Sequence, residues 1–170
     1  RELLYQQPDH ALARERLEAM LAEPATAYAA AEVLEPLYRK ESDWERLAAL
    51  LGARVAATRD RGALAKLHGQ LGELYQTHLA DEDAAFGHIA AALNARPDDT
   101  GVLRKLEGLA EAGERWSELS EALESALATS AGDEATTSKA RRSELLLHLA
   151  DLHEHKTGNT EKAIRALEQV

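Results

Sequence analysis

The sequence predicts an all-α protein in which antiparallel helix pairs stack into a right-handed solenoid. Ala, Leu and Glu dominate the composition while Phe, Ile and Val are scarce, which favours helix at nearly every position. Apolar residues recur at the spacing of amphipathic helices, between short stretches rich in Gly, Pro, Asp and Ser. The motif DWERLAALL at residues 43–51 also returns as RWSELSEAL at 115–123. Repetition of this kind is typical of helical repeat proteins.

The breakers divide the 170 residues into about nine helical stretches, which group into one truncated and four complete pairs. Short amphipathic helices are marginal alone, so each pair must cover the apolar face of its neighbour. We expect a helix over residues 9–22 to be the second helix of the truncated pair and residues 160–170 to form the last helix. The expected units of this single domain are residues 1–24, 25–61, 62–97, 98–133 and 134–170.

Two of the pairs share one apolar pattern. Leu34, Tyr38, Trp44, Leu47 and Leu51 in pair one have the same internal spacing as Leu106, Ala110, Trp116, Leu119 and Leu123 in pair three. The two Trp residues lie 72 positions apart and should occupy one structural position twice. Their register with the Leu residues predicts that both pack in the core between the helices of a pair.

The other two pairs share a different pattern, which carries a family resemblance. HGQLGELY at 68–75 is matched by LLHLADLH at 146–153, and Ala85 by Ala163, which is 78 positions later because extra residues lie within 130–142. His68, Leu71, Gly72 and Tyr75, followed by Ala85, Ile89 and Pro97, resemble the tetratricopeptide repeat. His stands where Trp is usual, and the turn has one added residue. Glu35 and Glu107 replace the family's small residue, so close approach of the helices is not expected there.

The resemblance implies that the first helix of each pair lines a concave groove in which ligand peptides lie. The family's carboxylate clamp, built from Lys and Asn, is not expected, because the only two Asn residues, Asn94 and Asn159, fall at helix ends or turns. The implied lining is mixed and mostly acidic, which favours an extended or helical partner segment with basic and apolar side chains. The implied groove residues are Glu32, Arg39, Lys66, Glu73, Gln76, Arg104, Glu111, Glu144 and Asp151.

Charge and missing motifs narrow the function classes. The formal net charge of −10 repels phosphate backbones and anionic headgroups, which argues against nucleic acid and membrane partners. No apolar run approaches the roughly 18 residues that a membrane span needs. Without Cys, a phosphate loop or a nucleophile motif, we expect a protein that is not an enzyme and carries no cofactor.

Three polar clusters have competing interpretations. Glu111, Glu114, Glu118, Glu121 and Glu124 recur every three or four residues, either as a solvated outer face or as a docking strip for a basic partner. Asp81, Glu82 and Asp83 lack the pattern of a calcium loop and are better explained by helix capping. A weak, opportunistic metal site could form from one set of residues at i, i+3 and i+7: His148, Asp151 and His155.

We therefore expect a non-catalytic protein–protein interaction scaffold, a repeat segment of a larger protein that is cut within its pattern. The alternative is a regulatory or sensor module that binds a small ligand or a metal ion. Composition hints at a bacterial source, and the compartment stays open with the cytoplasm slightly favoured. Self-association could occur through apolar faces at the two ends, formed by Leu3, Leu4, Leu12 and Leu17 and by Ile164, Leu167 and Val170.

Overall fold

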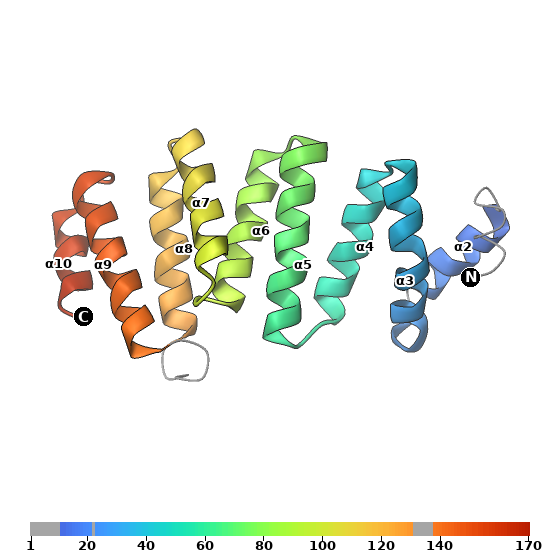
Figure 1. Ribbon diagram of the computed structural model, residues 1–170, viewed down its shortest axis with the longest axis horizontal. Helices are drawn as coiled ribbons and strands as arrows, with labels where there is room; N and C mark the ends of the chain where they lie inside the picture. The colour runs from blue at the N-terminus through green and yellow to red at the C-terminus, as the bar shows by residue number, and fades with distance from the viewer. Residues whose placement is uncertain (1–10, 22, 131–137) are drawn as a thin grey trace.

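The protein is helical wherever its structure is described. The computed structural model describes residues 11–21, 23–130 and 138–170, and within these ranges there are helices and turns but no strands. The predicted all-α class is therefore confirmed. Figure 1 shows the helices following one another in chain order along the longest axis of the molecule.

Consecutive helices run antiparallel and pack as four pairs after a single helix, α2 (Ala11–Met20) (Figure 1). Pair one is α3 (Pro24–Glu41) with α4 (Trp44–Ala57), and pair three is α7 (Thr100–Ala112) with α8 (Trp116–Thr129). Pair four is α9 (Lys139–His155) with α10 (Thr160–Leu167). Pair two is α5 (Arg61–Leu74), extended by the π-helical turn η1 (Tyr75–Leu79), with α6 (Glu82–Ala95).

Short polar side chains begin most of these helices. The first backbone N–H groups of a helix have no partner within the helix, and an Asp, Asn or Ser at the N-cap accepts from one of them. Asp81 accepts from the N–H of Ala84 at 2.9 Å, and Glu82 and Asp83 lie in the first turn of α6. This confirms that the acidic cluster caps a helix. The other side-chain caps are Asp43, Asp60, Asp99, Ser138 and Asn159.

The turn inside every pair has the same backbone geometry. In each case the residue directly before the N-cap of the second helix has a positive φ. These residues are Ser42, Ala80, Glu114 and Gly158, with φ of 58°, 51°, 53° and 65°. Only Gly adopts this conformation without a steric cost from Cβ. The four pairs therefore repeat in local geometry even where their sequences differ.

Ala80→Gly and Gly158→Ala, two substitutions at this shared position, should change the free energy of unfolding in opposite directions. We expect Ala80→Gly to raise the free energy of unfolding by about 0.5–1 kcal/mol, because relief of the left-handed Cβ strain exceeds the entropy cost of Gly. Gly158→Ala should lower it by a similar amount. Urea unfolding monitored by circular dichroism measures both changes. Equal shifts of the two variants in one direction would contradict a common left-handed turn.

The closeness of packing within a pair follows the residue that faces the second helix. Pairs two and four pack most closely, and they have Gly72 and the buried Ala150 at this position. A Cβ added to Gly72 would lie 2.6 Å from Cγ1 of Ile89. Pairs one and three have Glu35 and Glu107 instead and pack less closely, as their sequences predict.

The added residue in the turn of pair two is absorbed by η1. The N–H groups of Ala80 and Asp81 both reach back to the carbonyl oxygen of Tyr75, which widens the end of the first helix by one residue. Such π-helical turns commonly accommodate single insertions in an α-helix. The extra residues predicted within 130–142 fall mostly on 131–137, outside the described residues.

Both Trp side chains lie at the edge of the core rather than inside it. Trp44 and Trp116 are half-buried, and each begins the second helix of its pair. His78 of pair two stacks on Trp44 with ring centroids 3.8 Å apart, and Nζ of Lys156 in pair four lies 4.4 Å from the Trp116 ring. The predicted equivalence of the two residues is correct, and both rings pack against the core, but they do so at its edge and not in its interior between the helices of one pair. Each ring is covered by the end of the first helix in the next pair.

Apolar side chains are exposed near both ends of the described chain. Leu12 on α2, Ile164 and Leu167 on α10, and Val170 are exposed, whereas Leu17 is half-buried and packs against the core. Leu3 and Leu4 lie outside the described residues. Across the described ranges, we find no helix with both the length and the apolar character that a bilayer crossing requires.

Candidate functional site

An open groove of about 740 Å³ lies between α3, α4 and α5. Its apolar lining includes Leu21, Leu50 and Leu67, together with Ala side chains from all three helices. Polar groups stand among them: Tyr28 and Glu35 on α3, Arg54 on α4, and Lys66 and Gln70 on α5. An apolar lining with a few polar groups is the usual composition of a ligand-binding cleft.

Glu35 organises the charges of the groove. Arg54 donates to Oε2 of Glu35 at 2.6 Å, and Arg39 donates to Oε1 at 3.1 Å. One carboxylate therefore holds two guanidinium groups. A second hollow of about 320 Å³ adjoins the first and shares Tyr28, Glu35 and Arg54 with it. The Glu35–Arg54 ion pair thus lines both spaces.

Helix α3 packs on α2 and α4, and the groove lies on the side of α3 that faces α5. Glu35 stands where pair two has Gly72, so the ion pair with Arg54 occupies the space in which two helices would otherwise meet. In the described part of the chain, α5 packs on α4 but makes no close packing with α3. Glu35, where the sequence departs from the repeat pattern, therefore lies in the wall of this opening together with Arg54.

Lys66 lines the groove and has no ion-pair partner in the described part of the chain. Its side chain is exposed on α5. Together the two hollows present Arg39, Arg54 and Lys66 against Glu32 and Glu35, a balance of one positive charge. This local sign is opposite to the net charge of −10 of the whole chain.

All nine residues expected to line a partner groove are exposed on first helices or on η1. The structure brings three of them to the two hollows, Glu32, Arg39 and Lys66. The others lie farther along α5 and η1 or on α7 and α9. Glu73 pairs with Lys105 of α7 at 4.0 Å, whereas Glu144 pairs with Arg141 at 3.1 Å and Asp151 with His155 at 3.1 Å on their own helix. Gln76, Arg104 and Glu111 are exposed as well.

Sequence reasoning missed Tyr28, Arg54 and Gln70 in this groove. A signal for Tyr28 was present, because Tyr28, Glu32, Glu35 and Arg39 recur at spacings of four, three and four and so share one face of α3. Tyr28 is 66% exposed, which is unusual for a large aromatic side chain. Arg54 and Gln70 carried no comparable signal, because their role depends on how α4 and α5 pack.

The five Glu residues expected to form one acidic ridge differ in their contacts and in their exposure. Arg115 forms a paired contact with both carboxylate oxygens of Glu118, and this hydrogen bond lowers the pKa of that carboxyl group. Glu124 is half-buried and turns toward pair four. Glu111, Glu114 and Glu121 are exposed. The five carboxylates therefore do not form a single solvated strip.

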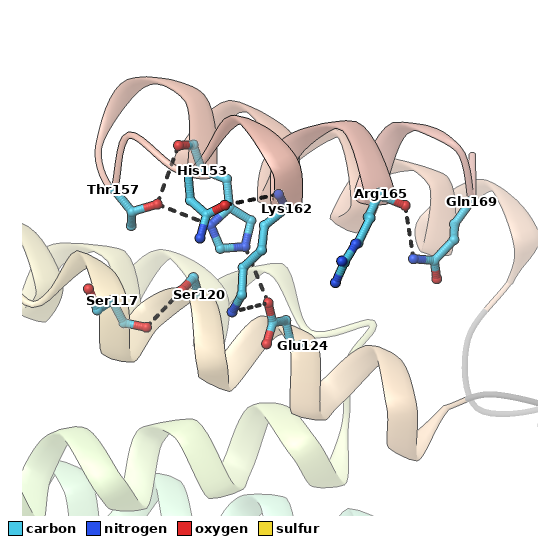
Figure 2. Close-up of polar contacts among 9 residues, drawn as sticks. Ser117, Ser120, Glu124, His153, Thr157, Lys162, Arg165 and Gln169 are labelled. Carbon is cyan, nitrogen blue, oxygen red and sulfur yellow. Dashed lines mark hydrogen bonds and ion pairs between the residues drawn. The ribbon is translucent and has the colours of Figure 1, made fainter.

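Glu124 instead joins three helices in a partly buried polar network (Figure 2). Lys162 of α10 donates to Oε1 of Glu124 at 3.0 Å, and Nε2 of His153 on α9 lies 3.3 Å from the same oxygen. His153 is only 2% exposed, and its other ring nitrogen lies 3.1 Å from the hydroxyl of Thr157. Both ring nitrogens thus have partners, as a buried imidazole requires.

The structure separates the residues of the weak metal-site candidate. Nε2 of His148 lies 3.0 Å from Oε1 of Glu107 on α7, without good hydrogen-bond geometry, while His155 pairs with Asp151 at the exposed end of α9. In the described residues no three His or carboxylate side chains gather in a way that could hold a metal ion. His148, Asp151 and His155 therefore form two separate contacts.

Two further His side chains meet between α5 and α6. Nδ1 of His68 lies 3.1 Å from Nδ1 of His88, so one ring must donate and the other accept. Burial lowers the pKa of both rings, and the charge of His88 lowers the pKa of His68 further. The ring of Tyr75 lies beside His88, with centroids 5.4 Å apart. The pair is therefore expected to be neutral near neutral pH.

The His68–His88 pair should make the free energy of unfolding sensitive to mildly acidic pH. In the unfolded chain a His binds a proton at a pKa of about 6.5, whereas the folded pKa values are lower, so below about pH 6.5 the unfolded chain binds more protons. The free energy of unfolding should therefore fall as pH drops from about 7 to about 5. A His68→Gln/His88→Gln variant should show a shallower fall in urea titrations at each pH. His155→Gln, an exposed control, should keep the wild-type slope, and an unchanged slope in the double variant would contradict the assignment.

A scan against protein-family models found no match, and a search of curated proteins likewise found none.

Proposed function

We propose that this chain is a non-catalytic protein–protein interaction scaffold, formed by a segment of a right-handed, tetratricopeptide-like solenoid within a larger protein. Support comes from four consecutive helix pairs with one shared turn geometry at Ser42, Ala80, Glu114 and Gly158. Further support comes from the order of the helices along the long axis (Figure 1). Arrays of this kind offer extended surfaces to partner segments rather than a closed reaction pocket.

The groove between α3, α4 and α5 is the proposed binding site. The single observation that carries the proposal is the combination of an apolar lining of Leu and Ala with Lys66, a cation that has no ion-pair partner among the described residues. A volume of about 740 Å³ is within the range of roughly 300–1,000 Å³ typical of ligand sites. Tyr28 adds an exposed aromatic surface, a residue type enriched where partners bind.

The chemistry of the lining defines the partner. Glu35 already neutralises Arg39 and Arg54 in part, which leaves Lys66 to attract a carboxylate. We therefore propose an apolar peptide segment that carries an acidic residue. The basic and apolar segment expected from the sequence is less suitable for this groove, because its charge would repel Lys66 and compete with the arginines for Glu35.

Selection from a library of short random peptides displayed on phage tests this proposal with the intact chain as bait. Selected peptides should combine apolar residues with Asp or Glu. The Lys66→Glu variant should bind them at least about tenfold more weakly, since an attractive charge becomes repulsive, and high salt should weaken wild-type binding. Lys105→Glu is the matched control, because Lys105 is an exposed lysine on the first helix of pair three that does not line the groove.

Two results would refute this assignment. One is the selection of peptides rich in Lys and Arg, and the other is equal binding by the wild type and the Lys66→Glu variant. Tyr28→Ala supplies a second variant, since loss of the exposed ring should weaken binding without disturbing the core. Circular dichroism spectra of all variants establish that the fold is intact.

A further inference from the structure

An open hollow of about 360 Å³ lies between α8, α9 and α10. Helix α9 packs on both α8 and α10, whereas α8 and α10 make no close packing with each other, so the hollow lies over α9 between the other two. Its apolar floor is formed by buried side chains from all three helices: Leu127, Leu146, Leu149 and Ala166. The volume is within the range of roughly 300–1,000 Å³ typical of ligand sites.

The charged residues around this floor are mainly cations. Three cations and one carboxylate line the hollow, namely Arg142, Lys162, Arg165 and Glu124. Their balance of two positive charges is opposite in sign to the net charge of −10 of the whole chain. Figure 2 shows Lys162 and Arg165 extending from α10 toward α8. Lys162 already pairs with Glu124 at 3.0 Å, so the surplus positive charge lies on the two arginines.

The two arginines have N–H groups to offer to a ligand. Arg142 is half-buried and donates to the carbonyl oxygen of Leu127 at 2.9 Å, but it makes no ion pair with any described residue. Arg165 pairs with Glu161, and both of these side chains are largely exposed. A guanidinium group has five N–H donors, so Arg165 can bind a second carboxylate without releasing Glu161. When Glu161 is counted as well, one uncompensated positive charge is left, which matches one carboxylate.

A second hollow, between α2, α3 and α4, shows that the surplus charge is particular to the first. It measures about 250 Å³. Counted from the N-cap, the sixth position is Ala49 in α4 and Arg165 in α10, and each lines its own hollow. In the hollow beside α4, one arginine, Arg46, lies 4.0 Å from one carboxylate, Glu18, so the charges balance. The repeat therefore provides the space, and the arginines of pair four provide the charge.

The hollow beside α10 does not depend on the exposed apolar face of that helix. Ile164 is exposed, whereas Phe86, which is also the fifth residue after its N-cap, is covered by the pair that follows α6. Successive residues of an α-helix are rotated by about 100°, which places Lys162 and Gln169 roughly opposite to Ile164 and Leu167. A further helix pair packed on Ile164 and Leu167 would therefore leave the hollow open.

We propose that this hollow binds a small organic carboxylate with an apolar chain. The guanidinium groups of Arg142 and Arg165 hold the carboxylate, because their parallel N–H groups match its two oxygens. The apolar chain lies on the Leu side chains of the floor. This binding goes beyond the proposed peptide groove between α3, α4 and α5, and either site can fail without the other.

Titration of the intact chain with octanoate, followed by NMR of the Leu methyl groups, tests the proposal. Saturable shifts of the Leu127, Leu146 and Leu149 signals are expected at millimolar octanoate. Arg142→Gln keeps an N–H donor for the carbonyl of Leu127 but removes the charge, and it should weaken binding at least about tenfold. Arg104→Gln is the matched control, because Arg104 is an exposed arginine on α7 that does not line the hollow.

A second variant tests the space rather than the charge. Ala128 is exposed on α8 and lines the hollow, so Ala128→Trp fills it without changing any charge and should also weaken octanoate binding at least about tenfold. Circular dichroism establishes that both variants are folded. Lys66→Glu, which alters the peptide groove, should leave octanoate binding unchanged.

Three results would overturn the proposal. The first is the absence of saturable shifts of these Leu signals at millimolar octanoate. The second is equal affinity of the wild type and the Arg142→Gln variant for octanoate. The third is equal binding of octylammonium, which has the same chain with the opposite charge, because the arginines would then have no part in recognition.

Discussion

Replacing Leu123 with alanine is expected to lower the free energy of unfolding by about 2–5 kcal/mol. Leu123 is fully buried in a core cluster that includes residues of α6, α7, α8, α9 and α10. Truncation removes one methine and two methyl carbons and leaves a cavity, because helices fixed by contacts on several sides cannot collapse around it. The better helix propensity of Ala returns only a few tenths of a kcal/mol and does not offset this loss.

Urea unfolding followed by circular dichroism measures the Leu123→Ala effect. Leu147→Ala is the matched control, because this Leu lies half exposed on α9 and its truncation should change stability by no more than about 0.5 kcal/mol. A loss below about 1 kcal/mol for Leu123→Ala would mean that pairs two, three and four do not share a core.

Alanine at Gly72 should destabilise the protein although alanine is the better helix former. The gain in helix propensity is about 1 kcal/mol. The new Cβ would lie 2.6 Å from Cγ1 of Ile89, closer still to Cδ1, and 3.3 Å from the carbonyl oxygen of Ala85. Ile89 is buried against pair three, so moving it costs about 1–3 kcal/mol. A net loss of up to about 2 kcal/mol is expected in the free energy of unfolding.

A double-mutant cycle separates these two contributions. Ile89→Ala removes both carbons that clash, so Gly72→Ala should become stabilising by about 1 kcal/mol in that background. Gly69→Ala, on the same helix with open space around its Cβ, should stabilise the wild type. If Gly72→Ala has the same effect with and without Ile89, the close approach of α5 and α6 is not the reason for this glycine.

Part of the candidate site could be predicted from the sequence. Glu32, Arg39 and Lys66 follow from the position of each residue on a first helix, and they lie at the two hollows. Glu35 was noted as a departure from the repeat, and the same residue lines the groove and pairs with Arg54. The groove itself was not predictable, because it depends on Arg54 reaching Glu35 from another helix. The prediction of one acidic ridge is wrong for the same reason. Lys162 of α10 and His153 of α9 contact Glu124, so this side chain turns toward pair four (Figure 2).

By itself the sequence determined the helices, their pairing and the equivalence of positions such as Trp44 and Trp116. These features depend on the spacing of apolar residues, on N-caps and on turns, all of which are local along the chain. Only the tertiary structure decided which of these residues are covered. Trp44 lies at the rim under His78, Ile164 is open while its counterpart Phe86 is buried, and Lys66 has no partner among the described residues. Burial and charge pairing depend on side chains from distant segments, and the pattern within one segment does not contain that information.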